Sequence, residues 1–328
     1  MRYMKNNMMK DLITLSLWGF LLIGITIYSL CSFMDWSSSY ASTIIFEVRL
    51  PRILLALLSG MGLTLAGFLF QLILNNPLAD SFTLGLASGA TLGAALTVFL
   101  GLSFLWIAPI SILFGVVSLF VVVLIAHVVS WGYPTKMLIL SGIMVGALIN
   151  AILYLLVQMN PQKLQNILNY MFGGFSAAEM REVIIIGSVL LCVISIISAL
   201  LPQLKLLQLN DLSSQSLGLK TQQLSIITLF IATLLSAVII GYVGVIGFIG
   251  IVIPQFVQRT SRGHLGIKMV LNLLIGGTVM VFADVLGSQL LSPTQLPASI
   301  VLALIGIPLM FYILVIEQKK RHQHGTNI

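Results

Sequence analysis

The chain contains repeated runs of about twenty apolar residues, separated by short polar connections. A helix needs roughly 20 apolar residues to cross the hydrocarbon core of a bilayer, because each residue adds only about 1.5 Å to its length. The runs therefore predict an all-α, polytopic membrane protein with about ten transmembrane helices. The predicted spans cover about residues 12–34, 50–73, 82–104, 107–129, 136–158, 183–201, 224–242, 244–260, 268–287 and 296–316.

Composition excludes a soluble protein. Of the 328 residues, 59% are hydrophobic and 8% are charged, whereas a soluble domain carries about a quarter of its residues as charges. The formal net charge of +7 could indicate a nucleic-acid partner, but the basic residues occur singly or in small groups between the apolar runs. That distribution is typical of charges that set membrane topology, and we expect no nucleic acid as partner.

The distribution of lysine and arginine predicts the orientation. Ten spans place both termini on one side, and a cytoplasmic N-terminus puts twelve of the 16 Lys and Arg residues inside. Inside connections are generally enriched in these residues, so we predict that both termini are cytoplasmic. Arg49 and Arg52 then lie outside, against the bias. The first run is too long for a signal peptide, and no cleavage site follows it, so we expect a retained span.

Three connections are longer than the others. The segments 35–48 and 159–182 are predicted outside, and the second favours a short amphipathic helix ending at Gly173–Gly174. The inside segment 203–223 is polar and predicts a docking surface, with a plain solvated loop as the alternative. Near residue 241, glycines at every third position indicate a tight bend with close backbone approach, not one straight helix.

Small residues line one face of the third span. Gly85, Gly89 and Gly93 recur every four residues with Ser88 beside them, so this face is nearly without side chains. Either a neighbouring helix or a passing substrate could approach it. The preceding connection reads NNPLADSF, and its proline, Pro77, forces a turn that could act as a hinge or gate.

Catalytic motifs are missing from the sequence. There is no HExxH, CxxC or GxSxG pattern, and no GxxxxGK[ST] loop that could hold the phosphates of ATP. We expect a protein that is not an enzyme and binds no cofactor or metal of its own. Cys31 and Cys192 lie in apolar runs and are expected to be buried, small apolar side chains. Asp284 lies within the ninth span, where it could be a proton relay or a structural hydrogen-bond partner.

Seven segments together resemble the FecCD-type permeases, the membrane subunits of type II ABC importers for iron–siderophore complexes, haem and vitamin B12. They follow one another in the family's order and extend over nearly the whole chain. The segments are RLPRILLALLSGMGLTLAGFLFQLILNNPLADSFTLGLASGA (49–90), MLILSGIMVGAL (137–148), YMFGGFS (170–176), LNDLSSQSLGL (209–219), GVIGFIGIVIPQFVQR (244–259), ADVLGS (283–288) and TQLPASIVLALIGIPLMFYIL (294–314).

The resemblance implies a type II ABC importer permease fold, with residues 1–328 forming a single transmembrane domain in the bacterial cytoplasmic membrane. It implies a second permease subunit, in a homodimer or a heterodimer with a similar chain. It also implies two cytoplasmic ATP-binding subunits, which carry ATP and Mg, and an extracytoplasmic substrate-binding protein or lipoprotein. The expected cargo is an iron complex, either a ferric siderophore or haem, with cobalamin as the alternative.

The resemblance also implies roles for particular residues. Arg49 and Arg52 match arginines that meet acidic groups of the binding protein, although Ser288 stands where the family has a further arginine. Gln255 replaces the family's usual histidine. The residues implied for the cytoplasmic gate are Asn76, Pro77, Leu78, Pro134 and Thr135. The residues implied for ATPase coupling are Asp211, Ser214, Gln215, Leu217 and Gly218.

A function from a different class is an ion- or proton-coupled secondary transporter that uses Asp284 without any ATPase. Transport with the proton gradient collapsed and ATP maintained distinguishes the two classes. The missing catalytic residue pairs disfavour a third class, an intramembrane enzyme.

Overall fold

The structure is a computed structural model of the chain. It describes residues 2–31, 40–129, 134–208, 216, 220–291 and 294–325. Within these ranges it does not describe the side chains of residues 2–8, 134–136, 165, 166, 169 and 313–325. All regular secondary structure in the described ranges is helical, which agrees with the predicted all-α class.

The helices follow one another along the chain without strands between them in the described part. They are α1 (Arg2–Cys31), α2 (Ala41–Thr43), the π-helix η1 (Ile44–Arg49), α3 (Leu50–Leu74), α4 (Leu86–Phe99), the 3₁₀ helix η2 (Phe104–Trp106), α5 (Ile107–Val129), α6 (Pro134–Met159), the 3₁₀ helix η3 (Pro161–Lys163), α7 (Leu164–Phe172), α8 (Met180–Leu206), α10 (Thr221–Val243), α11 (Ile249–Thr260), α12 (Leu265–Leu290) and α13 (Ala298–Gly325).

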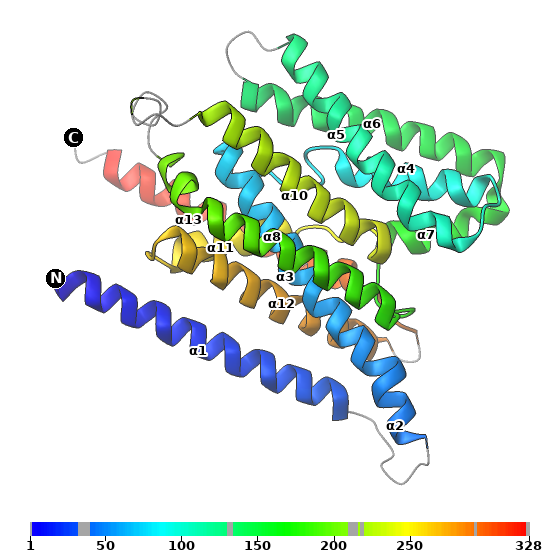
Figure 1. Ribbon diagram of the computed structural model, residues 1–328, viewed down its shortest axis with the longest axis horizontal. Coiled ribbons are helices and arrows are strands. Elements are labelled where there is room, and N and C mark those ends of the chain that lie inside the picture. The colour runs from blue at the N-terminus through cyan, green and yellow to red at the C-terminus, as the bar shows by residue number, and fades with distance from the viewer. Residues whose placement is uncertain are drawn as a thin grey trace.

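Helix α3 forms the centre of the bundle. It packs against α8, α10, α11 and α12, and most of its side chains are buried (Figure 1). A Cβ atom added to Gly60 would overlap the backbone of Gly276 on α12, and one added to Gly67 would overlap Gly250 on α11. Membrane helices commonly pack through such small residues. Lipid tails are as apolar as large side chains, so the helices associate through close van der Waals contact, which small residues allow.

The outer surface of the bundle carries large apolar side chains. Phe20 on α1, Phe120 on α5 and Met144 on α6 are each at least 65% exposed, as expected of a surface that meets lipid and not water. Cys31 and Cys192 also lie on the exposed surface, so the prediction that they are buried is wrong. An apolar run is equally compatible with a side chain that faces lipid and one that faces the bundle.

Seven described segments are long and apolar enough to cross a membrane, counting Ala41–Leu74 as one. They match seven of the predicted spans. The other three, 82–104, 244–260 and 296–316, correspond to shorter segments: α4 with 14 residues, α11 with 12 residues, and Ala298–Tyr312 within α13. The structure therefore supports a multi-pass helical protein, while the total of about ten crossings stays a prediction.

The predicted bend near residue 241 is present between α10 and α11. The chain leaves α10 at Gly244 with φ of 81° and enters α11 at Phe248 with φ of 67°. The predicted amphipathic helix is α7, which ends at Phe172 with Gly173 as its C-cap and abuts this bend. Gly174 donates its N–H to the Val243 carbonyl at 2.9 Å. The close approach depends on glycine, because a Cβ on Gly244 would meet the backbone of Gly173.

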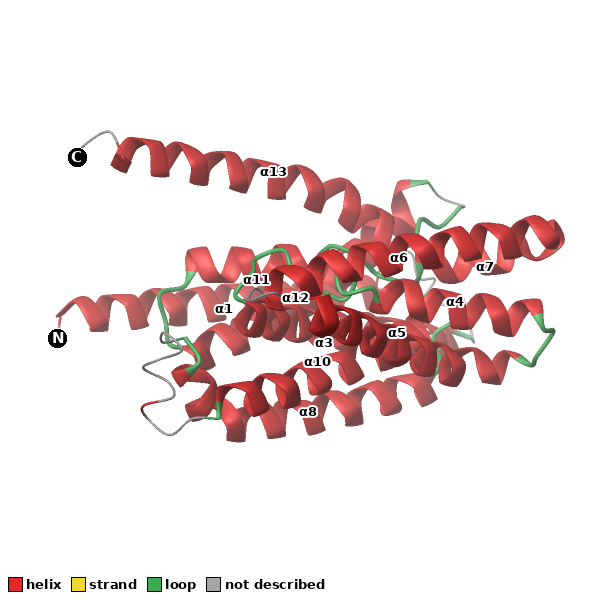
Figure 2. Cartoon of the chain, turned by 90° about the horizontal axis from the view of Figure 1, so that it is seen from above, coloured by secondary structure: helices red, strands yellow, loops and turns green. Residues whose placement is uncertain are grey.

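The start of α1 and the end of α13 lie at the same end of the bundle in both views (Figures 1 and 2). An even number of membrane crossings would produce this arrangement. Helix α1 has 30 residues, so it extends about 45 Å and brings Cys31 to the opposite end. That opposite end carries the arginine pair singled out in the sequence.

Candidate functional site

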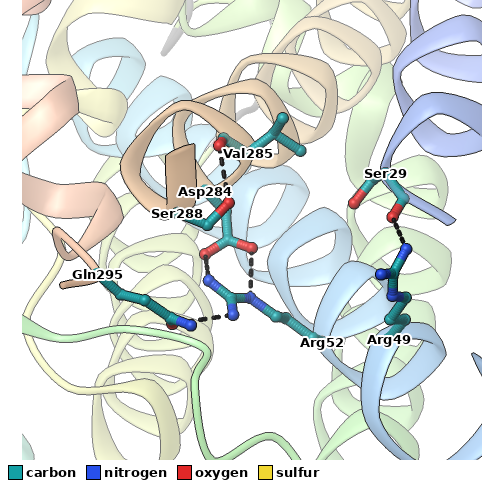
Figure 3. Close-up of polar contacts among 7 residues, drawn as sticks. All are labelled: Ser29, Arg49, Arg52, Asp284, Val285, Ser288 and Gln295. Atoms are coloured by element: carbon teal, nitrogen blue, oxygen red, sulfur yellow. Dashed lines mark hydrogen bonds and ion pairs between the residues drawn. The ribbon is translucent and has the colours of Figure 1, made fainter. Parts of the chain in front are cut away.

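Arg52 lies in the first turn of α3 and forms an ion pair with α12 (Figure 3). Its Nε donates to Asp284 Oδ2 at 2.7 Å, and its Nη2 donates to Asp284 Oδ1 at 2.9 Å. Its Nη1 donates to Gln295 Oε1 at 3.0 Å. The Arg52 and Asp284 side chains are 20% and 9% exposed, respectively. The pair is therefore largely shielded from water and has the two-pronged geometry that makes arginine–carboxylate contacts strong.

Arg49 contacts a different element, the end of α1 (Figure 3). Its Nη1 donates to the backbone carbonyls of Leu30 at 2.8 Å and of Ser29 at 3.3 Å. Carbonyls in the last turn of a helix have no partner within the helix and carry partial negative charge. A guanidinium group supplies both the missing hydrogen-bond donors and a positive charge. Arg49 therefore holds the end of α1 against the start of α3.

The backbone around the two arginines is irregular. Residues Ile44–Arg49 form a π-helix that runs directly into α3. Pro51 has no N–H to donate to the carbonyl four residues before it, so the regular α-helical ladder is interrupted there. Short π-helical turns are frequently found at functional sites. Here the irregular turn presents Arg49 to α1 and Arg52 to α12.

Ser288 lies one helical turn after Asp284 on α12, at the position where the resemblance implies a further arginine. Its hydroxyl donates to the Val285 carbonyl at 2.8 Å, so it bonds within its own helix (Figure 3). The site shown in Figure 3 therefore contains two cations and one carboxylate.

Sequence reasoning identified both arginines but missed their partners. From the sequence, Asp284 is predicted to be a proton relay or a structural hydrogen-bond partner, and no pattern singles out Gln295. The available signal was the carboxylate itself: an acid inside an apolar span requires a counter-ion or hydrogen-bond donors. No pattern in the sequence around Asp284 identifies Arg52 as the cation that pairs with it.

The turn between α3 and α4 is compact, with exposed residues on either side of a buried Asp80. Asn76 Oδ1 accepts the Leu78 N–H at 2.9 Å, and Asp80 Oδ1 accepts the N–H groups of Phe82 at 3.1 Å and Thr83 at 2.9 Å. Burial raises the pKa of the Asp80 carboxyl to about 6, and the hydrogen bonds from Thr83 and Phe82 partly oppose that rise. The turn is thus held by its own side chains, while Leu78 is exposed.

The remaining residues implied for the gate and for coupling are only partly visible. Pro134 and Thr135 begin α6, but their side chains are outside the described set, so no contact between them and Asn76, Pro77 or Leu78 is established. The coupling residues lie outside the described ranges altogether. They are Asp211, Ser214, Gln215, Leu217 and Gly218.

The small-residue face of α4 is occupied by neighbouring helices. A Cβ on Gly89 would lie 2.6 Å from the Phe114 carbonyl oxygen, and one on Gly93 would lie 2.7 Å from that of Ile110, both on α5. Ser88 faces Gly146 on α6, and the Gly85 carbonyl accepts the Ser118 hydroxyl at 2.8 Å. Of the two interpretations left open, this placement favours helix packing over a substrate path.

Gln255 belongs to a polar cluster between α11 and α3 that the sequence did not reveal. Pro254 has no N–H, so the Gly250 carbonyl lacks its partner within α11. Gln71 Nε2 donates to that carbonyl at 3.2 Å, and Gln255 Nε2 donates to Gln71 Oε1 at 2.7 Å. Both glutamines are buried. The cluster therefore satisfies a backbone group that proline leaves without a donor.

These features define a multi-pass helical membrane protein with a cation-bearing site at one end of the bundle. A model described as the FecCD transport family matches residues 12–316. The chain therefore belongs to the FecCD transport family. It is an ABC transporter permease, a class of subunit without an ATPase of its own, and is a multi-pass protein of the bacterial inner membrane.

Individual relatives support this assignment. The Fe(3+)-citrate import system permease protein YfmE of Bacillus subtilis is 32% identical over 85% of this chain and 84% of its own length. The molybdate import system permease protein MolB of Haemophilus influenzae is 33% identical over 84% of this chain and 82% of its own length. A solved inward-facing metal-chelate type ABC transporter is 30% identical, with a TM-score of 0.83, and the match covers 92% of this chain and 98% of that one.

Proposed function

We propose that the chain is the permease subunit of an ATP-driven importer that takes an iron complex from an extracytoplasmic binding protein to the cytoplasm by alternating access. The observation that supports this most directly is that Arg49 ends η1 and Arg52 lies in the first turn of α3, because the start of α3 lies away from the termini in the bundle (Figure 1). With the termini cytoplasmic, this end faces outward. A second permease subunit and two ATP-binding subunits would complete the importer.

The proposed route of coupling starts at the segment 203–223. ATP binding closes the two ATP-binding subunits and moves this segment, and the movement switches which gate of the permease is shut. Asp211, Ser214, Gln215, Leu217 and Gly218 are the proposed contact residues. Asn76, Pro77 and Leu78 are proposed for the cytoplasmic gate together with Pro134 and Thr135.

The proposed substrate class is a ferric siderophore or haem. YfmE is named for ferric citrate, and the solved relative is of metal-chelate type. A large, already chelated cargo is also compatible with the small number of charged residues within the apolar runs. MolB, however, is named for molybdate, so an oxyanion is the substrate class against which the proposal must be tested.

The secondary-transporter alternative has less support. A proton carrier must gain and lose its proton during each cycle, but Asp284 is held by two hydrogen bonds from Arg52. Both carboxylate oxygens accept hydrogen bonds from this guanidinium, which is the geometry of a structural ion pair. Asp284 is better explained as the counter-ion of Arg52.

The test is transport by the purified importer in proteoliposomes, with the ATP-binding subunits facing the ATP-containing side and the binding protein on the other. Ferric siderophore, ferric citrate, haem, cobalamin and molybdate are offered separately. We expect ATP-dependent accumulation of an iron complex, unchanged when the proton gradient is collapsed. Accumulation of molybdate alone would contradict the substrate class, and accumulation that needs the gradient but not ATP would contradict the mechanism.

A further inference from the structure

The Arg52 guanidinium has two edges that can each bind a carboxylate, and the structure uses them unequally. Arginine has five N–H donors in a fixed planar fork. Asp284 occupies the edge formed by Nε and Nη2 with both of its oxygens. Among the described residues, the only acceptor at Nη1 is the neutral amide oxygen of Gln295. The edge formed by Nη1 and Nη2 is therefore not paired with a carboxylate there.

The surroundings of the two edges also differ. Asp284 is 9% exposed, whereas Gln295 is an exposed residue in the connection before α13. One edge of Arg52 is thus fixed to the bundle, and the other is next to an uncharged side chain at the surface (Figure 3). A guanidinium held at one edge by a carboxylate loses little further freedom when it binds a second one, so its affinity for that second group is higher.

We propose that Asp284 is a positioning residue that fixes Arg52 so that its Nη1–Nη2 edge receives an aspartate or glutamate side chain of the extracytoplasmic binding protein. Gln295 is the neutral acceptor that this carboxylate displaces. This inference rests on the proposed function, because it specifies how one of the two proposed docking arginines binds its partner.

Exchange of Asp284 itself for the incoming carboxylate is the less favourable route. Breaking the ion pair would leave a largely buried carboxylate without its cation, which is strongly destabilising. Displacing Gln295 removes only a hydrogen bond to a neutral, exposed amide, which water replaces at little cost. The docked state therefore retains the Arg52–Asp284 pair and adds a second carboxylate to the same guanidinium.

The test measures binding of the importer's own binding protein, fluorescently labelled, to the complete transporter in lipid nanodiscs. In Asp284→Asn, an NH2 group replaces one carboxylate oxygen and cannot accept a hydrogen bond from Arg52. The two-pronged contact is lost, so the guanidinium is no longer fixed. We expect Kd to rise about tenfold. An account based on net charge alone predicts the reverse, because this substitution makes the surface more positive. Unchanged or tighter binding by Asp284→Asn would overturn the inference.

Gln295 supplies the matched pair of variants. Gln295→Glu places an internal carboxylate at the edge proposed for the partner, so we expect weaker binding and a smaller dependence of Kd on salt concentration. Gln295→Ala removes the neutral acceptor, so we expect binding as tight as that of the unaltered protein or tighter. Equal affinities of the Glu and Ala variants would overturn the inference.

Arg52→Ala separates this inference from the proposed function. If Arg52→Ala leaves Kd and its salt dependence unchanged, Arg52 does not dock the binding protein and the proposed docking role fails. If Arg52→Ala weakens binding while Asp284→Asn does not, docking stands and the positioning role of Asp284 fails. Yield and monodispersity of each transporter after purification exclude misfolding as the cause of a change.

Discussion

The Arg52 guanidinium on α3 and the Asp284 carboxylate on α12 are joined by two hydrogen bonds, of 2.7 Å and 2.9 Å, although the residues are 232 positions apart in the chain. The pair connects the central helix of the bundle with the helix packed most extensively against it. It therefore has a structural role in addition to the proposed role in docking, and the two roles can be measured separately.

The structural role predicts a non-additive effect on stability. Arg52→Met leaves the Asp284 carboxylate without its cation in a site that is 9% exposed, and we expect a loss of about 2–3 kcal/mol of unfolding free energy. Adding Asp284→Leu removes the isolated charge, so the double variant should regain part of that loss. Unfolding in detergent checks this, with the exposed Arg181→Met as control. A double variant that loses the sum of the two single losses would contradict the prediction.

Arg49 predicts a local effect at the end of α1. Arg49→Ala removes the donor to the Leu30 and Ser29 carbonyls, so the last turn of α1 should open more often, by a factor of about five in its amide hydrogen exchange. Arg49→Lys retains a positive charge near the helix end and should show a smaller increase. Hydrogen exchange read by mass spectrometry checks both variants. Equal exchange in Arg49→Ala and the unaltered protein would show that the contact does not hold the helix end.

The glutamine cluster predicts an order of stabilities. Gln71→Leu leaves the Gly250 carbonyl without the donor that compensates for Pro254, and we expect a loss of about 1–3 kcal/mol. Gln255→Leu should cost less, because Gln71 can still reach that carbonyl. Gln255→His restores a donor to Gln71 and should be close to the unaltered protein. Thermal unfolding of the three variants checks the order, and a larger loss in Gln255→Leu than in Gln71→Leu would contradict it.

Much of the fold could be predicted from the sequence because membrane helices are local features. The predicted span 107–129 coincides with α5, and the bend near residue 241 was indicated by its glycines. The span predicted at 244–260 was longer than α11, because apolarity does not show where the backbone turns. Phe248 precedes α11 as its N-cap with φ of 67°, a conformation for which a phenylalanine gives no sequence signal.

The site was less predictable than the fold, because its contacts join distant parts of the chain. Arg49 and Arg52 were conspicuous as charges on the predicted outer side. Their partners were not: Arg52 pairs across 232 positions and Gln71 with Gln255 across 184. No periodicity connects such residues. Only the requirement that a buried carboxylate or amide be satisfied indicated that partners must exist.

The small residues of α4 give a last prediction, which separates packing from a substrate path. Gly89→Ala would place a methyl group 2.6 Å from the Phe114 carbonyl oxygen on α5, and overpacking of this kind costs about 1–3 kcal/mol. Gly24→Ala on α1 is the matched control, because nothing lies within 4 Å of the added Cβ. We expect Gly89→Ala to unfold at a lower temperature and Gly24→Ala not to. Unchanged stability with slower transport in Gly89→Ala would instead place this face of α4 on the substrate path.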